Sequence, residues 1–272
     1  MPDVDALEGQ LIAFLHELAD IAGEAALPYF RAELEVEDKS GGARFDPVTA
    51  ADRAVETALR TAILGRFPDH AIQGEEFAER VSSSPYRWVI DPIDGTKAFV
   101  CGLPTWGTLI GVCRDGVPIV GMMSQPFVGE RFIGGSSRAV WSRRGEERVL
   151  HARATRELGA AYLFATAPDM FQRDTEWPAF SRLSERVRIT RYGVDSYAYC
   201  MLAAGYADLV VEAGLGFYDV AALLPVVAAA GGVMTGWRGE PVRQGGRIIA
   251  AANADLHAQA LAVLNGEHDP AL

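Results

Sequence analysis

The chain has 272 residues, of which 49% are hydrophobic and 22% are charged, and its formal net charge is −11 with a pI near 5.0. This composition supports a substantial hydrophobic core in one large or two smaller domains, and it excludes a disordered tail or a small stapled scaffold. The acidic balance offers no broad attractive field to nucleic acid or to an anionic membrane surface, so we expect neither partner.

The first part of the chain predicts two amphipathic helices. Apolar residues at helical spacing predict one helix from Leu7 to about Arg31 and a second from about Thr49 to Phe67, where Pro68-Asp69 stops it. The glycine-containing stretch from Lys39 to Phe45 predicts a mobile loop between them.

A run of strands follows the second helix. The segments Ala71 to Glu76 and Tyr86 to Ile90 read as strands, and each is followed by acids. Next, Trp106 to Cys113 and Val117 to Met123 flank Arg114-Asp115-Gly116, which is a hairpin signature. Shorter strands up to about residue 150 extend this hairpin into an antiparallel sheet.

Beyond residue 150 strands alternate with helices. The expected strands lie at Tyr162–Thr166, Val187–Tyr192, Ala207–Glu212, Val233–Thr235 and Arg247–Ala251. The expected helices lie at Trp177–Arg186, Ser196–Ala204, Val220–Ala230 and Asp255–Leu264. The sequence therefore predicts an α+β half over residues 1–150 and an α/β half over residues 151–272, packed as a sandwich of alternating helix and sheet layers.

Features of the chain's cysteines and ends predict a cytosolic protein. Cys101, Cys113 and Cys200 are odd in number and widely spaced, which fits a reducing compartment. The segment Met1 to Glu8 lacks the basic start and apolar block of a secretory signal. No uninterrupted apolar run reaches the roughly 18 residues that a membrane span needs.

The segment Asp91-Pro92-Ile93-Asp94-Gly95-Thr96 is the most informative in the chain. Two carboxylates at the junction of a strand and a helix repel each other unless a hard divalent cation binds them. Gly95 permits close approach of an anion, and the N–H groups around Thr96 can hold phosphate oxygens. Asp-Pro and Asp-Gly are also common in ordinary turns. Two further apolar segments end in acids, at Glu75-Glu76 and at Asp219, and they favour a metal and phosphate site.

Two other phosphate chemistries fit the sequence poorly. In haloacid dehalogenase-type phosphatases an Asp two residues before the second acid attacks phosphorus, and Pro92 occupies that position here. No glycine-rich nucleotide-binding loop ending in Lys-Ser or Lys-Thr occurs. The five histidines form no pair at metal-ligand spacing.

With Gly74-Glu75-Glu76, the Asp91–Thr96 segment and Tyr218-Asp219-Val220-Ala221-Ala222 in this order, the chain resembles the inositol monophosphatase superfamily. The match extends from Asp46 to Gly232. Tyr218 stands where the superfamily usually carries Trp. The resemblance implies a Mg²⁺-dependent, lithium-sensitive phosphatase of small molecules with two or three Mg²⁺ per subunit, which works as a homodimer.

The resemblance also assigns roles to individual residues. It makes Glu75, Asp91 and the backbone carbonyl of Ile93 ligands of one Mg²⁺, and Asp91, Asp94 and Asp219 ligands of a second. Phosphate is held by Asp94, Gly95 and Thr96. Glu75 orients the attacking water, and Thr96, polarised by Asp52, helps to deprotonate it. Two cations about 4 Å apart can stabilise the attacking and leaving oxygens together, so no phosphoenzyme is needed.

Within the superfamily, Thr190–Tyr199, Thr166–Phe171, Lys97 and Phe99 resemble the histidinol-phosphatase branch. Asp195 is an acid where sugar-cyclitol phosphatases typically carry a small uncharged residue. Glu212 aligns with a residue that contacts substrate hydroxyls, and Asp219 reaches the same region. Acids beyond the phosphate favour a cationic alcohol, because opposite charges stabilise each other when they are partly desolvated.

Each substrate residue has a structural alternative that the sequence leaves open. Asp195 can be the N-cap of the following helix, and Glu212 can belong to an ion pair. Arg191 either holds phosphate or neutralises acids, and Lys97 can be a solvated surface residue. The leading hypothesis is hydrolysis of L-histidinol phosphate. The alternatives are a broader inositol-1-monophosphatase and, from another class, a non-catalytic sensor of metal or phosphometabolite.

Overall fold

The computed structural model describes residues 4–33, 36–38 and 47–266, so the Lys39–Phe45 loop lies outside the described residues. Helix α1 (Val4–Ala26) and helix α2 (Ala50–Arg66) are the two expected N-terminal helices. α1 ends before the predicted Arg31, because the residue before Pro28 is disfavoured in helical conformation. Thr49 caps the start of α2 in a capping box, in which Asp52 accepts the Thr49 N–H.

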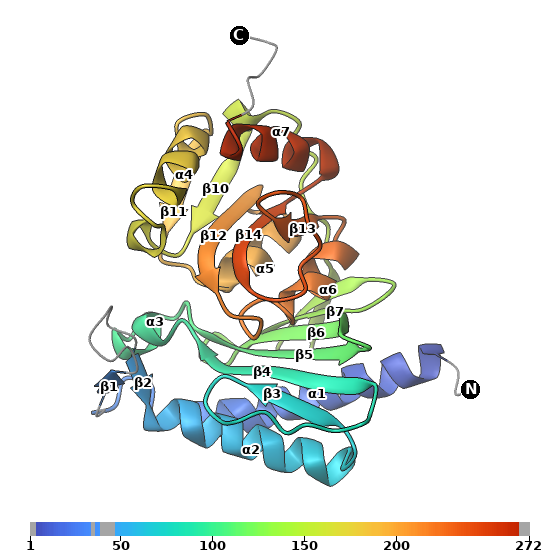
Figure 1. Cartoon of the computed structure of the whole chain (residues 1–272). Helices are drawn as coiled ribbons and strands as arrows, with labels where there is room; N and C mark the ends of the chain where they lie inside the picture. Colours follow the sequence, from blue (N-terminus) through green and yellow to red (C-terminus); the bar gives the residue numbers. More distant parts are fainter. Residues whose placement is uncertain (1–3, 34–35, 39–46, 267–272) are drawn as a thin grey trace.

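A seven-stranded sheet packs on these two helices (Figure 1). In spatial order its strands are β3 (Ala71–Gly74), β4 (Tyr86–Asp94), β5 (Gly107–Arg114), β6 (Val117–Gln125), β7 (Glu130–Gly134), β8 (Ala139–Arg143) and β9 (Glu146–Val149). Only the β3–β4 pair is parallel. The predicted β5–β6 hairpin is confirmed, and its turn residues Asp115 and Gly116 both have positive φ.

A five-stranded mixed sheet forms the C-terminal half. Its spatial order is β11 (Ile189–Tyr192), β10 (Tyr162–Ala165), β12 (Leu209–Leu215), β14 (Gly246–Ala251) and β13 (Val233–Gly236). Helices α4 (Glu176–Ser184) and α7 (Ala254–Leu264) cover its outer face, and their apolar residues share a core with Leu163, Val211 and Ile249. The remaining short elements are β1 (Val36–Asp38), β2 (Pro47–Thr49), α3 (Thr96–Val100) and the 3₁₀ turns at Leu158–Ala160 and Pro168–Met170.

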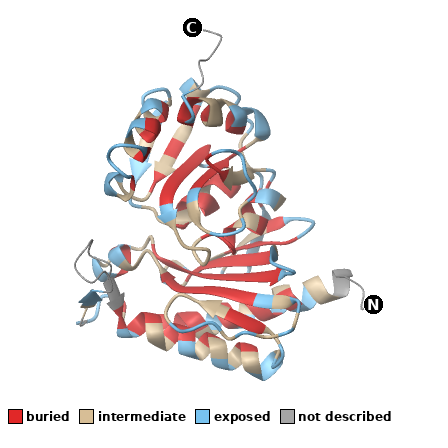
Figure 2. Cartoon of the chain, in the orientation of Figure 1, coloured by how far each residue is buried: buried red, intermediate tan, exposed pale blue. Residues whose placement is uncertain are grey.

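Helices α5 (Tyr197–Ala203) and α6 (Leu223–Ala229) lie between the two sheets. Their core includes Leu109 and Met123 of the first sheet together with Val210 and Ile248 of the second. The layers run helix, sheet, helix, sheet, helix, and the inner strands are buried (Figure 2). The predicted layered sandwich is confirmed. The proposed boundary at residue 150 falls in the connection between β9 and β10.

Two glycines fix how α6 approaches the first sheet. A Cβ at Gly121 would lie 1.9 Å from the Ala222 carbonyl oxygen, and one at Gly134 would lie 2.4 Å from Val226 backbone atoms. Larger residues at these positions would therefore push α6 off β6 and β7. Because Asp219 lies just before α6, this close contact also determines where Asp219 meets β4.

Candidate active site

Three carboxylates converge where β4 ends. Asp91, Asp94 and Asp219 each offer one oxygen, and these oxygens all lie within 4.8 Å of one another. Residues three apart on a regular strand point to opposite faces. Here the register shifts, since Asp91 pairs with Leu109 and Asp94 with Gly107, so β4 carries one extra residue. The resulting bulge turns both carboxylates toward Asp219.

Backbone N–H groups orient two of these acids. The Ser196 N–H donates to Asp94 Oδ2 at 2.8 Å, and the Gly216 N–H donates to Asp219 Oδ2 at 2.6 Å. Asp91 is only 2% exposed, and its Oδ1 has no hydrogen-bond partner in the described part of the chain. A buried oxygen without a partner is costly. The described residues therefore lack a group that accepts the lone pairs of this Asp91 oxygen.

The electrostatics of the cluster point to a cation. Burial raises the pKa of Asp91 well above its usual value, and the charges of Glu75, Asp94 and Asp219 raise it further. Burial and then Asp94 likewise raise the pKa of Asp219, and burial raises that of Asp94. No Lys or Arg of the described segments forms an ion pair with these three acids. Clustered carboxylate oxygens suit a hard divalent cation, which would remove their mutual repulsion.

Glu75 and the Ile93 carbonyl border the cluster. Glu75 follows β3 and lies outside the three-oxygen set, yet its charge acts on both Asp91 and Asp219. The Thr96 hydroxyl donates to the Ile93 carbonyl at 3.0 Å, and Asp52 Oδ1 lies 3.5 Å from the same hydroxyl. Asp52 is fully buried at the start of α2. One hydroxyl proton serves one acceptor best, so Thr96 points chiefly to Ile93 here.

Asp195 lies against Gly95, in the turn that is predicted to bind phosphate. It has a left-handed backbone with φ 44°, and a Cβ added at Gly95 would lie 3.1 Å from Asp195 Cγ. Burial, Asp94 and Glu212 raise the pKa of Asp195 to about 8, and Lys97 opposes the rise. The N-cap alternative for Asp195 is wrong, because α5 begins after Ser196 without a side-chain cap. Its carboxylate instead faces the acid cluster.

Glu212 on β12 is buried, and both of its carboxylate oxygens accept hydrogen bonds from neutral donors. Glu212 Oε1 accepts from both the N–H (2.9 Å) and the hydroxyl of Thr166, and Oε2 accepts from the Tyr199 hydroxyl at 2.9 Å. Burial raises the pKa of Glu212 to about 7. The ion-pair alternative is wrong, since no Lys or Arg among the described residues pairs with Glu212.

The two predicted basic residues differ in position. Lys97 is exposed at the first turn of α3, close enough to act on Asp195. Arg191 is exposed on β11, and no described interaction joins it to the acid cluster. The structure therefore brings Asp91 and Asp94 of β4 together with Asp219, which lies between β12 and α6, and places most other predicted residues beside them, whereas no described interaction joins Arg191 to this cluster.

Sequence reasoning missed the partners that hold these acids. Ser196, Thr166 and Tyr199 received no role, although all three stand in segments that carry the family resemblance. Their roles depend on a backbone N–H or a hydroxyl that meets an acid 13 to 102 positions away. A short motif contains no trace of such a long-range contact.

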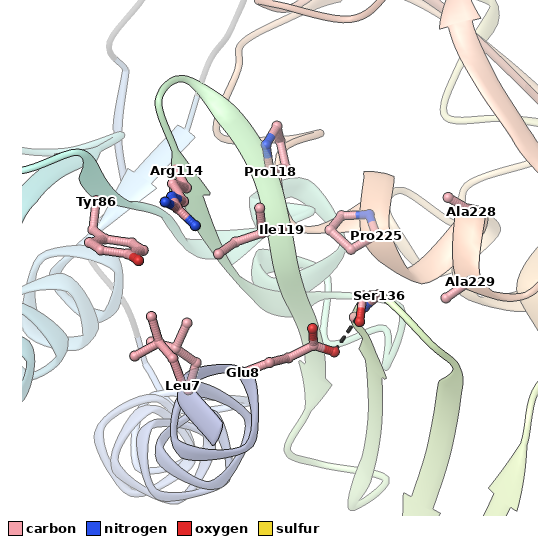
Figure 3. A pocket seen from close by; sticks show the side chains of 12 residues that line it. Leu7, Glu8, Tyr86, Arg114, Pro118, Ile119, Ser136, Pro225, Ala228 and Ala229 are labelled. Atoms are coloured by element: carbon pink, nitrogen blue, oxygen red, sulfur yellow. Dashed lines mark hydrogen bonds between the residues drawn. The ribbon is translucent and has the colours of Figure 1, made fainter. Parts of the chain in front are cut away.

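A cavity of about 520 Å³ lies far from this site, between α1, the β5–β6 hairpin and α6 (Figure 3). Leu7, Ile119 and Pro225 give it apolar walls, and the Ser136 N–H donates to Glu8 at its rim. Arg114, which also lines it, is the last residue of β5, whereas Asp94 pairs with the first. Strand geometry puts about 24 Å between those ends. None of the predicted site residues lines this cavity.

The family model described as "Inositol monophosphatase family" matches residues 8–268. The chain belongs to this family. It is thus a phosphatase of the phosphoric monoester hydrolase class, in a family that depends on metal, and its acidic cluster fits that requirement. The predicted family is confirmed. No helix of the described part combines the length and apolarity of a membrane span.

Named phosphatases and a solved structure are similar to this chain over most of its length. The chain is 41% identical to the chloroplastic bifunctional phosphatase IMPL2 of Arabidopsis thaliana, over 90% of this chain and 72% of that protein. It is 35% identical to a histidinol-phosphatase of Streptomyces coelicolor, over 92% of this chain and 95% of that one. Among solved structures, an inositol monophosphatase from Zymomonas mobilis is 38% identical, with a TM-score of 0.83 and coverage of 94% and 98%.

Proposed function

We propose that this phosphatase hydrolyses L-histidinol phosphate to L-histidinol and inorganic phosphate with Mg²⁺ as its cation, a step of histidine biosynthesis. The observation that carries the proposal is the position of Asp195. Its carboxylate lies against Gly95, beside the predicted phosphate site, and Glu212 is close enough to raise its pKa. Relatives named histidinol-phosphatase at 32 to 35% identity support the same substrate.

Charge is the reason for preferring this alcohol. Partly buried Asp195 and buried Glu212 border the region where the leaving alcohol would lie, and among the described residues Lys97 is the cation that acts on Asp195. L-Histidinol carries an ammonium group and a protonatable imidazole, whereas inositol carries no charge. A cationic group bound beside Asp195 and Glu212 would keep both carboxylates ionised.

The chain's own residues divide the work of hydrolysis. Glu75, Asp91, Asp94, Asp219 and the Ile93 carbonyl are the groups that would hold two or three Mg²⁺. When bound, the cations supply the positive charge that stabilises the attacking and leaving oxygens of an in-line displacement. Gly95 and Thr96 bind the phosphate oxygens through backbone N–H groups.

Proton transfer falls to the residues beside the cluster. Glu75 orients the attacking water. The Thr96 hydroxyl accepts a proton from this water and passes its own proton toward Asp52. For that role the Thr96 hydroxyl must turn from Ile93 to Asp52, whose Oδ1 lies 3.5 Å away. Binding of the Ile93 carbonyl to a cation would release the hydroxyl for this turn.

A substrate panel tests the proposal directly. Purified protein with Mg²⁺ should release phosphate from L-histidinol phosphate at a kcat/KM at least about tenfold above that for inositol 1-phosphate, which corresponds to about 1.4 kcal/mol. Fructose 1,6-bisphosphate and a nucleotide monophosphate complete the panel. Equal or faster release from inositol 1-phosphate would favour the alternative activity, inositol-1-monophosphatase, for which relatives at 28 to 31% identity are named.

Family membership argues against the non-catalytic sensor, and turnover with Mg²⁺ in the same panel would exclude it. We also propose a cytosolic homodimer. The homodimer rests on the family resemblance, and the cytosolic location on the cysteines, which are all free in the structure. Sedimentation of the purified protein tests the dimer.

A further inference from the structure

A residue of helix α2 that has no role in the proposed hydrolysis holds the loop that carries Glu75. Glu56 is fully buried on α2, and its Oε2 accepts the N–H of Glu76 at 2.8 Å. Glu76 directly follows Glu75, so this bond fixes the peptide on the C-terminal side of the Glu75 side chain. A buried carboxylate is a strong acceptor for a backbone N–H, because the bond is charge-assisted.

Gly74 makes this contact possible from the other side of Glu75. A Cβ at Gly74 would lie 1.9 Å from Glu56 Oε1 and 2.3 Å from Glu56 Cδ. Only glycine lets a carboxylate approach the backbone that closely. Glu56 therefore packs against the residue before Glu75 and bonds to the residue after it.

Arg60, one helical turn after Glu56, contacts both Glu56 and the loop that carries Glu75. Its Nε donates to Glu56 Oε1 at 2.7 Å, and its second terminal nitrogen donates to the Phe77 carbonyl at 3.1 Å. The guanidinium also lies 5.9 Å from the centroid of the Phe77 ring. Arg60 thus neutralises the buried carboxylate and holds the loop at a second point, which its planar fork of donors allows.

The base of the same loop is closed by backbone bonds. Ile72 and Arg80 exchange two hydrogen bonds, of 3.0 and 2.8 Å. Glu75 therefore lies in a loop that is pinned at its base and again beside Glu75 itself. Moving the backbone of Glu75 away from the acid cluster requires the contacts of Glu56 and Arg60 to break.

We propose that Glu56 and Arg60 are positioning residues, which hold Glu75 at the cation site and so increase the affinity for Mg²⁺. The inference rests on the proposed role of Glu75 as a Mg²⁺ ligand. Neither residue touches substrate. Their effect passes through Glu75, as the partners behind metal ligands do in other proteins, where their loss costs about 10- to 100-fold in affinity.

Calorimetric titration of the full-length protein with Mg²⁺, without substrate, tests this. Glu56→Gln keeps the size of the side chain but removes the charge that Arg60 and the Glu76 N–H require. We expect its Kd for Mg²⁺ to rise about tenfold. Arg60→Lys keeps a positive charge but loses the second donor to Phe77, and a smaller increase of about threefold is expected.

A double-variant comparison separates positioning from general destabilisation. If Glu56 acts through Glu75, then adding Glu56→Gln to Glu75→Gln should weaken Mg²⁺ binding no further. A merely structural Glu56 would weaken binding equally in both backgrounds, and that result would overturn the proposal.

Asp208 supplies the matched control. It too is fully buried, and its Oδ2 accepts an arginine, Arg153, at 2.7 Å and a backbone N–H, that of Tyr162, at 2.8 Å. It lies beside the five-stranded sheet, so Asp208→Asn should leave the Kd for Mg²⁺ within about twofold of wild type. A loss as large as that of Glu56→Gln would show that any buried pair has this effect, and would overturn the proposal.

The remaining outcomes are equally decisive. Wild-type Kd values for both Glu56→Gln and Arg60→Lys would overturn the proposal. Should Glu56→Gln fail to fold, Arg60→Lys alone decides. Wild-type protein that binds Mg²⁺ but releases no phosphate from L-histidinol phosphate would refute the proposed substrate and leave this test intact.

Discussion

Acids in two regions of this molecule differ in whether a positively charged side chain lies beside them. Asp208, in the C-terminal half, has Arg153 and a backbone N–H as partners within the protein. Asp91, Asp94 and Asp219, where β4 ends, form no ion pair with a Lys or Arg of the described residues, and one oxygen of Asp91 has no hydrogen-bond partner there. One oxygen of Asp208 also lacks a hydrogen-bond partner among the described residues, but Arg153 balances its charge within the protein. The second group has no such cation beside it and requires positive charge from outside.

The largest effect that this contrast predicts is the loss of activity in Asp94→Asn. The change removes one charge from the cluster while keeping an acceptor for the Ser196 N–H. We expect kcat/KM for L-histidinol phosphate to fall more than about 100-fold, because a direct ligand matters more than the partners behind it. Phosphate release is the measurement, and Mg²⁺ affinity should fall with it. Activity within about tenfold of wild type would contradict the assignment of Asp94.

The stability of the metal-free protein should respond with opposite signs in the two regions. In EDTA, Asp208→Asn should lower the free energy of unfolding by about 1–3 kcal/mol, because it weakens buried bonds of Asp208 to Arg153 and Tyr162. Asp94→Asn should raise it by about 1 kcal/mol, because repulsion within the cluster decreases. Urea unfolding of both variants beside wild type measures this. A decrease for both would show that the cluster is not under electrostatic strain.

Asp195→Ala sharpens the comparison at the substrate end of the site. Loss of its charge should raise KM for L-histidinol phosphate about tenfold and change kcat little, because the interaction binds the alcohol in both ground and transition states. KM for inositol 1-phosphate should stay the same or decrease. Steady-state kinetics with both substrates measure the difference. An equal change for the two would mean that Asp195 does not recognise positive charge.

The effect that is smallest at any single pH step is a pH dependence of stability from Glu212. Its pKa is raised from 4.5 to about 7, so the folded protein retains a proton that the unfolded chain releases between these values. The contribution of Glu212 to stability therefore decreases as pH rises through this window and is constant above it. The change stays below about 1.4 kcal/mol per pH unit.

Glu212→Gln, which cannot titrate, isolates this effect. In EDTA the difference in unfolding free energy between wild type and variant should shift against wild type as the pH is raised from about 5 to about 7. Urea unfolding at several pH values measures it. A difference that is independent of pH would show that the buried Glu212 carboxyl keeps an ordinary pKa.

Much of the fold could be predicted because local signals agreed with it. The capping box at Thr49, the Asp115-Gly116 turn and the apolar strands depend on neighbours in sequence. The end of α1 was placed too late, since the apolar spacing continues past Pro28 while the helix cannot. The ion pair expected as an alternative for Glu212 was wrong for a different reason: its partners, Thr166 and Tyr199, are neutral and distant in sequence.

The sequence by itself determined which acids follow which strands, and hence the family and the class of chemistry. Tertiary structure decided how those acids meet. A bulge in β4 turns Asp91 and Asp94 to one face, and Gly121 and Gly134 let α6 approach closely enough to bring Asp219 to them. The fold also decided what surrounds each acid, whether an arginine, hydroxyl groups or other acids. The physical reason is that a residue type shows which charge can be present, while burial and long-range contacts set the free energy of keeping it there.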